Sequence, residues 1–145
     1  MSTQTDTSLR ITRIIKADRE RVFRAWTDPK DMKQWSCPES AVVDQVDVDL
    51  RVGGRYRIRM KGEQEVWTAV GEYRTVDPPK KLVYSWDWEE KKHQVGETLV
   101  TVELNDLGGS TEVVLTHERF PSAEATKSHT EGWTSCLNRL ESLFA

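Results

Sequence analysis

Three histidines are the side chains of this sequence best suited to exchange a proton near neutral pH. His93 lies in a polar loop, His117 near the end of a predicted strand and His129 on the predicted last helix. His129 stands one helical turn before Trp133, on the face expected to point inward, where it could serve as acid, base or polar anchor. The alternative, a histidine with local hydrogen bonds or an exposed one, is the commoner case. His129 is therefore only a weak catalytic candidate.

No other pattern indicates catalysis, a cofactor or a metal. The histidines lack the i and i+4 spacing that places two metal ligands on one helix face. There is no G-x-S-x-G nucleophile elbow. Cys37 and Cys136 are far apart and form no C-x-x-C pair, so neither a disulfide scaffold nor a zinc site is predicted.

A glycine pair in the stretch VDVDLRVGGRYRIRM could cradle a phosphate or turn a hairpin. A phosphate loop needs a following helix whose N-terminal amides face the anion. Gly53 and Gly54 instead precede a run that alternates between basic and apolar residues, which is typical of a strand. The context therefore predicts a tight hairpin turn.

The alternation after the glycines assigns two faces to one strand. The inward face is predicted to carry Tyr56, Ile58 and Met60, and the outward face Arg55, Arg57 and Arg59. We expect the arginines to be solvated and to pair with Asp47 and Asp49 across the hairpin. The alternative is a basic patch that contacts an acidic partner.

Aromatic residues are concentrated on the predicted inward faces. They could fill the core, since tryptophan and tyrosine bury large areas, or line a ligand pocket with a few polar anchors. For any single ring the core is the commoner place, whereas the whole set favours a cavity about as well as a filled core. The predicted lining of such a cavity is Trp35, Tyr56, Ile58, Met60, Trp67, Tyr84, Trp86, Trp88, His129 and Trp133.

The elements that position these side chains follow from hydrophobic periodicity. Residues 1–8 are predicted to form a flexible tail, and residues 9–145 a single domain. After a first strand, Asp18 can cap one short helix and Asp28 a second that begins at Pro29. Short alternating segments between residues 41 and 120 indicate an antiparallel meander. Ser122 can cap a long amphipathic helix that reaches Phe144.

This order predicts an α+β fold: a curved antiparallel sheet of six to seven strands wrapped on the long C-terminal helix. A strongly bent sheet that grips one helix tends to leave space between the two layers. Because only one sheet face is dry, that space should be apolar.

The chain resembles the START-like, or SRPBCC, superfamily of helix-grip domains, and within it the branch named after the activator of the heat-shock-protein-ninety ATPase. The resemblance rests on AWTDPKDMKQW, DLRVGGRYRIRM, GEYRTVDPPKKLVYSW, TVELNDLGGSTEVVLTHE and EGWTSCLNRLESL, in family order. One departure is Trp35-Ser36-Cys37-Pro38, where the family often has Trp-Trp-x-Pro. Members of the superfamily bind lipids, sterols, polyketides and plant hormones beneath the last helix, and some catalyse cyclisation there.

Three functions follow as hypotheses. The first is a non-enzymatic domain that binds a small apolar or aromatic ligand. The second is a module that activates a chaperone or contacts another protein through Arg55, Arg57 and Arg59. The third is a cyclase-like or dehydratase-like enzyme that uses His129.

Composition narrows the setting. A net charge of −3 argues against general binding to nucleic acid. No apolar run reaches the length of a membrane span, and the N-terminus lacks the apolar core of a signal peptide, so a cytoplasmic protein is expected. A homodimer is the commonest default for small symmetric assemblies.

Overall fold

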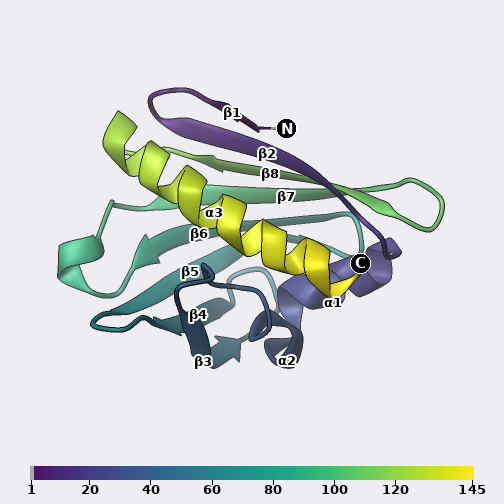
Figure 1. Cartoon of the computed structure of the whole chain (residues 1–145), viewed down its shortest axis with the longest axis horizontal. Coiled ribbons are helices and arrows are strands. Elements are labelled where there is room, and N and C mark those ends of the chain that lie inside the picture. Colours follow the sequence, from purple (N-terminus) through teal and green to yellow (C-terminus); the bar gives the residue numbers. More distant parts are fainter. Residues whose placement is uncertain (1) are drawn as a thin grey trace.

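The computed structural model describes residues 2–145 and confirms the α+β helix-grip arrangement, with one long helix lying across one face of an antiparallel sheet (Figure 1). The helices of the described chain are α1 (Arg19–Thr27), α2 (Pro29–Met32), the 3-10 helix η1 (Lys91–His93) and α3 (Ala123–Leu143). Its eight strands are β1 (Ser2–Gln4), β2 (Ser8–Ile15), β3 (Val42–Val48), β4 (Arg55–Lys61), β5 (Val66–Asp77), β6 (Lys81–Trp88), β7 (Thr98–Asp106) and β8 (Thr111–Glu118).

The sheet order is β1-β2-β8-β7-β6-β5-β4-β3, and every neighbouring pair is antiparallel. Strands β3 to β8 therefore form the predicted meander. The helices α1 and α2 connect β2 near one edge to β3 at the other, at the end of the sheet where the C-terminus also lies (Figure 1). This connection places the α1–α2 segment as one wall of the space between sheet and α3.

The N-terminal segment differs from the predicted flexible tail. Ser2–Gln4 forms β1, which pairs with β2 in the register Ser2 to Ile11 and Gln4 to Leu9. The hairpin is closed by Thr5, whose backbone N–H donates to the Ser8 carbonyl at 2.8 Å. Short polar strands such as this one are held by backbone hydrogen bonds at a sheet edge, which alternation of residue types does not reveal. The described sheet thus has one strand more than predicted; Met1 lies outside the described residues.

The predicted helix caps are confirmed. The Asp18 carboxylate accepts a hydrogen bond from the backbone N–H of Arg21 at 2.9 Å, and that of Asp28 from Lys30 at 2.9 Å. Ser122 caps α3 by accepting from the Ala125 N–H at 3.1 Å. Each cap satisfies one backbone donor that has no partner within its helix.

The glycine pair turns a hairpin between β3 and β4, as predicted. Gly53 has a φ of 85°, a conformation that residues with a Cβ rarely adopt. A Cβ on Gly54 would lie 2.0 Å from the backbone oxygen of Asp49. The turn sets the phase of β4: its apolar side chains Tyr56, Ile58 and Met60 are buried, and its arginines lie on the opposite face.

Helix α3 is tied to the rest of the fold at both flanks. On the β1–β2 side, the Thr126 hydroxyl donates to the Asp6 carbonyl at 2.8 Å, and Arg13 donates to Asn138 at 2.7 Å. On the other side, Arg139 donates to the Cys37 carbonyl at 3.2 Å, in the loop that follows α2. The helix therefore crosses the concave face of the sheet and is held by hydrogen bonds at both flanks. None of the helices in residues 2–145 is long and apolar enough to cross a membrane.

Candidate functional site

A cavity of about 300 Å³ lies beneath α3. Its floor is formed by β4, β5 and β6, its roof by α3, and its far wall by α1, α2 and the loop 36–41. The contacts at β2 and at this loop hold the two flanks of α3, and two tryptophan–histidine hydrogen bonds join the helix to β6 and β8.

All ten residues predicted from the sequence to surround a cavity lie on its wall. Trp35 comes from the segment after α2, His129 and Trp133 from α3, and the others from β4, β5 and β6. The inward phase of each element identifies the side chains that face the sheet's concavity.

Several lining residues were not among those predicted from the sequence. Trp26 comes from α1, Met32 from α2, Tyr73 from β5 and Cys136 from α3. They line the same cavity together with Ser36, the residue at the departure from the family pattern. The only sequence signal for these residues is the inward side of the helix or strand on which each one lies. Whether that side reaches the cavity depends on how α1, α2 and α3 pack.

The aromatic rings of the cavity wall contact one another edge to face. The ring centroids of Tyr56 and Tyr84 are 5.2 Å apart at 78°, and those of Trp86 and Trp88 are 5.3 Å apart at 83°. The ring centroid of Trp133, on α3, lies 5.4 Å from that of Trp86. Such pairs stabilise beyond the area they bury. They make the lining a rigid apolar surface.

Two tyrosine hydroxyls in the wall have defined hydrogen bonds. Tyr56 donates to the Ser85 carbonyl at 2.7 Å, whereas the oxygen of Tyr84 accepts from the indole N–H of Trp26 at 3.2 Å. Burial raises the pKa of both phenols, so both are neutral at physiological pH. The cavity thus offers hydroxyl groups rather than charges.

His129 lies in the wall with both ring nitrogens engaged. Its Nδ1 lies 2.8 Å from the Ala125 carbonyl, and its Nε2 accepts a hydrogen bond from the Trp88 indole N–H at 3.1 Å. This arrangement requires the neutral tautomer that carries its proton on Nδ1. Burial lowers the pKa of His129, although the Ala125 hydrogen bond and the nearby Asp87 charge oppose the shift. Both ring nitrogens of His129 are therefore engaged in contacts within the protein.

His117 is fully buried behind the wall and holds one of the wall's tryptophans. Its Nδ1 accepts from the Trp133 indole N–H at 2.9 Å, so its proton is on Nε2, which lies 2.7 Å from the Thr98 hydroxyl. Burial, followed by the His129 charge, lowers the pKa of His117 well below its ordinary value. The sequence placed His117 at a strand end but gave no sign of this role.

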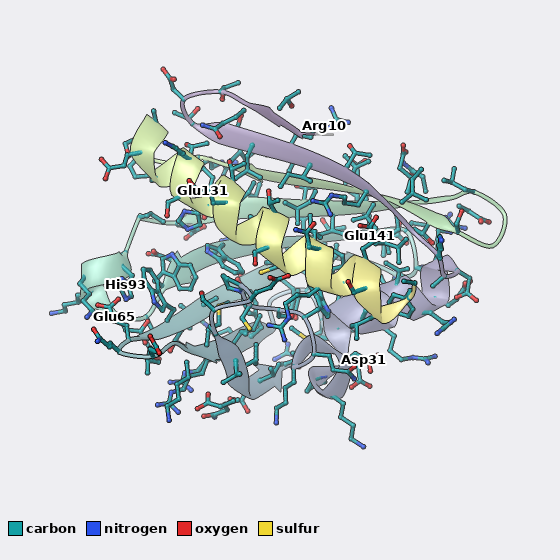
Figure 2. The ribbon with its side chains drawn as sticks, viewed as in Figure 1. Arg10, Asp31, Glu65, His93, Glu131 and Glu141 are labelled. Carbon is teal, nitrogen blue, oxygen red and sulfur yellow. The ribbon has the colours of Figure 1, made fainter. Side chains whose placement is uncertain are left out.

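Two buried nitrogen atoms have no hydrogen-bond partner in the described chain: Trp86 Nε1 and His93 Nε2. The Trp86 ring meets the His117 ring edge to face, with centroids 5.7 Å apart. His93 stacks on Trp67 with centroids 3.3 Å apart, and its Nε2 is 3.6 Å from the Glu65 carboxylate, beside η1 (Figure 2). His93 therefore buttresses Trp67, a cavity residue.

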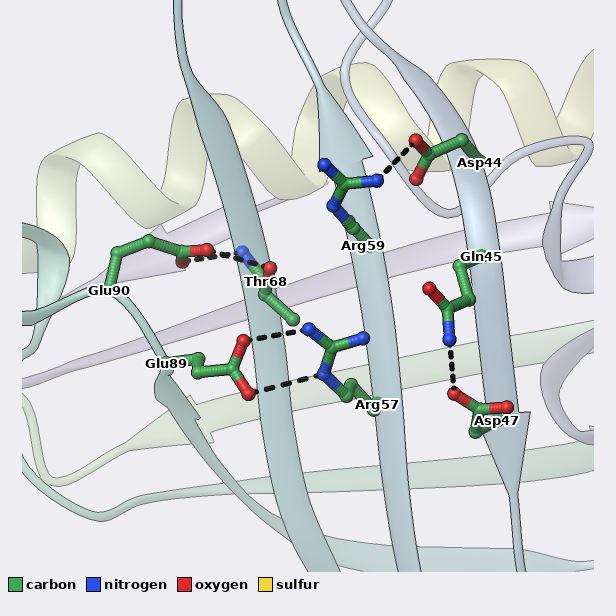
Figure 3. A network of polar contacts seen from close by, with 8 residues as sticks. All are labelled: Asp44, Gln45, Asp47, Arg57, Arg59, Thr68, Glu89 and Glu90. Carbon is green, nitrogen blue, oxygen red and sulfur yellow. Dashed lines mark hydrogen bonds and ion pairs between the residues drawn. The ribbon is translucent and has the colours of Figure 1, made fainter.

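Arg57 and Arg59 of β4 lie on the sheet face opposite α3, in a mixed network of charges (Figure 3). Arg57 makes two hydrogen bonds to Glu89, and Arg59 one to Asp44 at 2.8 Å. Asp47 lies opposite Arg57 across the hairpin, as predicted, but neither Asp47 nor Asp49 forms an ion pair with a β4 arginine among the described residues. Asp44 lies at a bulge between Val43 and Gln45, which brings an additional carboxylate beside Arg59.

The two predicted partners, Asp47 and Asp49, form hydrogen bonds and ion pairs with other residues. Asp49 binds Arg51 at 2.9 Å, within the turn, and Asp47 accepts from Gln45 at 3.0 Å. Arg55 is exposed and forms no ion pair with any described residue. The basic outward face of β4 is thus largely neutralised by neighbouring carboxylates.

Both cysteines are free thiols and both are buried. An Arg139 nitrogen lies 2.9 Å from Cys37 Sγ. Burial raises the pKa of Cys37, with Arg139 opposing the shift, and burial also raises that of Cys136. No cluster of three metal-binding side chains occurs among residues 2–145.

Comparison with solved structures finds the same fold throughout the chain. Protein CV1439 from Chromobacterium violaceum is 25% identical, with a TM-score of 0.86 over 95% of this chain and 96% of its own. The AHSA1 protein from Silicibacter pomeroyi is 27% identical, with a TM-score of 0.81 over 93% of this chain and 95% of its own. A protein from Staphylococcus epidermidis is 26% identical, with a TM-score of 0.81 over 98% and 92%.

A comparison with curated proteins gives no match. The family model described as "Activator of Hsp90 ATPase homolog 1-like protein" matches residues 16–145, which include every lining residue of the cavity. The resemblance inferred from the sequence motifs is thus confirmed over nearly the whole chain. The chain belongs to the Activator of Hsp90 ATPase homolog 1-like family of SRPBCC helix-grip domains.

Proposed function

We propose that this protein binds a small apolar or aromatic molecule in the cavity beneath α3. The observation that carries the proposal is a cavity of about 300 Å³ whose wall is built mainly from tryptophan, tyrosine and methionine side chains. Pockets for small molecules are of this kind, apolar with a few polar groups that fix orientation. A filled core would have left no such volume.

The size of the cavity sets the scale of the ligand. An engineered apolar cavity of about 150 Å³ holds one benzene molecule. The cavity here, about 300 Å³, matches a body of two rings or a branched chain of similar size. Its lining residues Ser40, Trp67 and Ser128 are exposed, so the side between the loop 36–41, β5 and α3 is the route of entry.

The test is a titration of the isotope-labelled protein with two-ring aromatics, sterols and fatty acids, followed by amide and indole N–H chemical shifts. Binding in the cavity should shift the indole signals of Trp86, Trp88 and Trp133 in a saturable manner. Shifts confined to surface amides, or none for any compound, would contradict the proposal.

A matched pair of variants at Gly132 links binding to the cavity. Gly132 lines the cavity, and a Cβ built on it meets no atom within 4 Å. Gly132→Leu should therefore fill the space and abolish binding without disturbing the fold, while Gly132→Ala should retain most of it. If both variants bind as well as the wild type, the ligand lies elsewhere.

The family description favours a second candidate, an interaction with a chaperone ATPase. The surface proposed from the sequence is Arg55, Arg57 and Arg59, of which two are paired with acids. A pull-down with the chaperone tests this candidate, using the triple change of these arginines to glutamate. Unchanged capture by the variant would exclude this surface, and failure of the wild type to be captured would exclude the candidate.

A further inference from the structure

We infer that the ligand of the cavity is a neutral molecule whose apolar body carries one hydrogen-bond-accepting oxygen, bound by the hydroxyl of Tyr84. This inference deepens the proposed function and rests on it. It follows from the charges and from the unused hydrogen-bond donors of the wall.

The wall excludes a charged ligand group. Among the described residues that line the cavity there is no aspartate, glutamate, lysine or arginine. His129 is neutral, with both nitrogens occupied. Burial raises the pKa of Tyr56, Tyr73 and Tyr84, so these phenols stay protonated and supply no countercharge. A buried carboxylate or ammonium group without a partner would be strongly disfavoured.

Besides the indole N–H of Trp86 and the hydroxyl of Tyr73, neither of which is hydrogen-bonded to a described residue, the wall holds a third unused donor on Tyr84. The Tyr84 oxygen accepts from the Trp26 indole, and its own O–H hydrogen has no acceptor among the described residues. The Tyr56 hydroxyl has already donated to the Ser85 carbonyl. Both partners of the Tyr84–Trp26 pair line the cavity. Because an unpaired buried donor is rarer and costlier than an under-used acceptor, the ligand should supply an acceptor.

The position of Tyr84 also orients the ligand. Tyr84, Trp86 and Trp88 alternate along β6, so all three face the cavity and span about 13 Å at 3.3 Å per residue. Tyr84 lies at the α1 end, bonded to Trp26, and its ring is 6.1 Å from that of Tyr73. Trp88 lies at the other end, bonded to His129 and 5.5 Å from the exposed Trp67. The ligand's oxygen therefore points inward and its apolar body toward the entry.

Three probes of nearly identical shape separate these requirements: 2-isopropylnaphthalene, 2-acetylnaphthalene and 2-naphthoate. They carry, respectively, no acceptor, a neutral acceptor and an anion. In calorimetric or NMR titrations above neutral pH, the ketone should bind about three- to tenfold more tightly than the hydrocarbon, as expected for one net hydrogen bond. The carboxylate should bind most weakly of the three.

Tyr84→Phe alone would free the Trp26 indole N–H to donate to the ketone. The double variant Trp26→Phe/Tyr84→Phe should therefore remove the advantage of the ketone over the hydrocarbon, and continued binding of the hydrocarbon shows that the cavity remains intact. Tyr56→Phe is the matched control, because that hydroxyl is already donated, and it should keep the preference. The carbonyl stretching band of bound 2-acetylnaphthalene gives a second readout. It should lie at lower frequency in the wild type than in the double variant Trp26→Phe/Tyr84→Phe.

Each outcome decides a different point. Equal binding of ketone and hydrocarbon, or tightest binding of the carboxylate, would overturn the inference while leaving the proposed function in place. An unshifted carbonyl band in the wild type would overturn the role of Tyr84. Failure of all three probes to bind the wild type would remove the proposed function itself.

Discussion

The indole N–H of Trp88 donates a hydrogen bond to Nε2 of His129 at 3.1 Å and thereby joins β6 to α3 across the cavity wall. A second bond of the same kind joins the Trp133 indole to Nδ1 of His117 at 2.9 Å, between α3 and β8. In both bonds the imidazole accepts. Protonation would place a donor opposite each indole N–H, so both contacts require neutral histidines.

This geometry predicts that stability falls in mild acid. The folded-state pKa values of His117 and His129 are both lowered by burial, whereas the unfolded chain has the ordinary value of about 6.5. The unfolded state therefore takes up protons first. The free energy of unfolding should be constant above pH about 6.5 and should decline below it by up to about 1.4 kcal/mol per pH unit for each histidine.

Urea unfolding at several values between pH about 7.5 and 5 measures this decline while most carboxylates remain ionised. His129→Gln should make the slope shallower by up to one proton's contribution. Equal stability of the wild type at the two ends of this range would show that neither histidine is held neutral.

Two glycine-to-alanine changes should have opposite effects on stability. A Cβ on Gly71 would lie 1.9 Å from the Ser85 carbonyl oxygen and 2.7 Å from the Tyr56 ring, so β5 would be forced away from β6. Gly71→Ala should lower the free energy of unfolding by about 3 kcal/mol or more. Gly132→Ala, in open space on α3, should raise it by about 0.5–1 kcal/mol. Denaturant midpoints compare the two, and a well-tolerated alanine at Gly71 would contradict the close approach of β5 and β6.

Adjacent glutamates after β6 should differ in their importance. The Glu90 carboxylate accepts from both the backbone N–H and the hydroxyl of Thr68, each at 2.7 Å. Burial acts to raise the pKa of Glu90, but the hydrogen bonds from Thr68 hold this pKa below its ordinary value. Glu90→Gln should therefore cost about 1–3 kcal/mol of stability.

Glu89 is the matched control, since its carboxylate binds only the half-buried Arg57 side chain, at the surface of the sheet. Glu89→Gln should cost less than about 1 kcal/mol, and less still at high salt. Thermal unfolding of both variants measures the difference. A larger loss for Glu89→Gln than for Glu90→Gln would contradict the described contacts.

The two thiols should react slowly in the folded protein. Cys37 and Cys136 are buried, and burial raises the pKa of both, so little thiolate is present or reachable. Iodoacetamide should modify both much faster in urea than in buffer, as followed by mass spectrometry of the separated peptides. Rapid labelling of the native protein at Cys37 would show that the Cys37 side chain is accessible and that the guanidinium of Arg139 stabilises its thiolate.

Local patterns in the sequence determined which way each element faces. Alternation in β4 put Tyr56 and Ile58 inward because successive side chains of a strand point to opposite faces. Asp18, Asp28 and Ser122 marked the helix starts because a side-chain oxygen satisfies donors that the helix leaves unpaired. These are short-range effects, and they sufficed to predict the fold and ten of the residues that line the cavity.

The tertiary structure alone decided which groups meet across long sequence separations. It brought Trp88 to His129 and Trp133 to His117, and it formed the ion pair of Arg57 with Glu89 rather than with Asp47. It added β1, whose hold on the sheet is made by backbone groups. It also fixed the volume beneath α3, through contacts such as Arg139 with Cys37. Partners and volumes depend on packing angles and bulges, for which a single sequence carries no local signal.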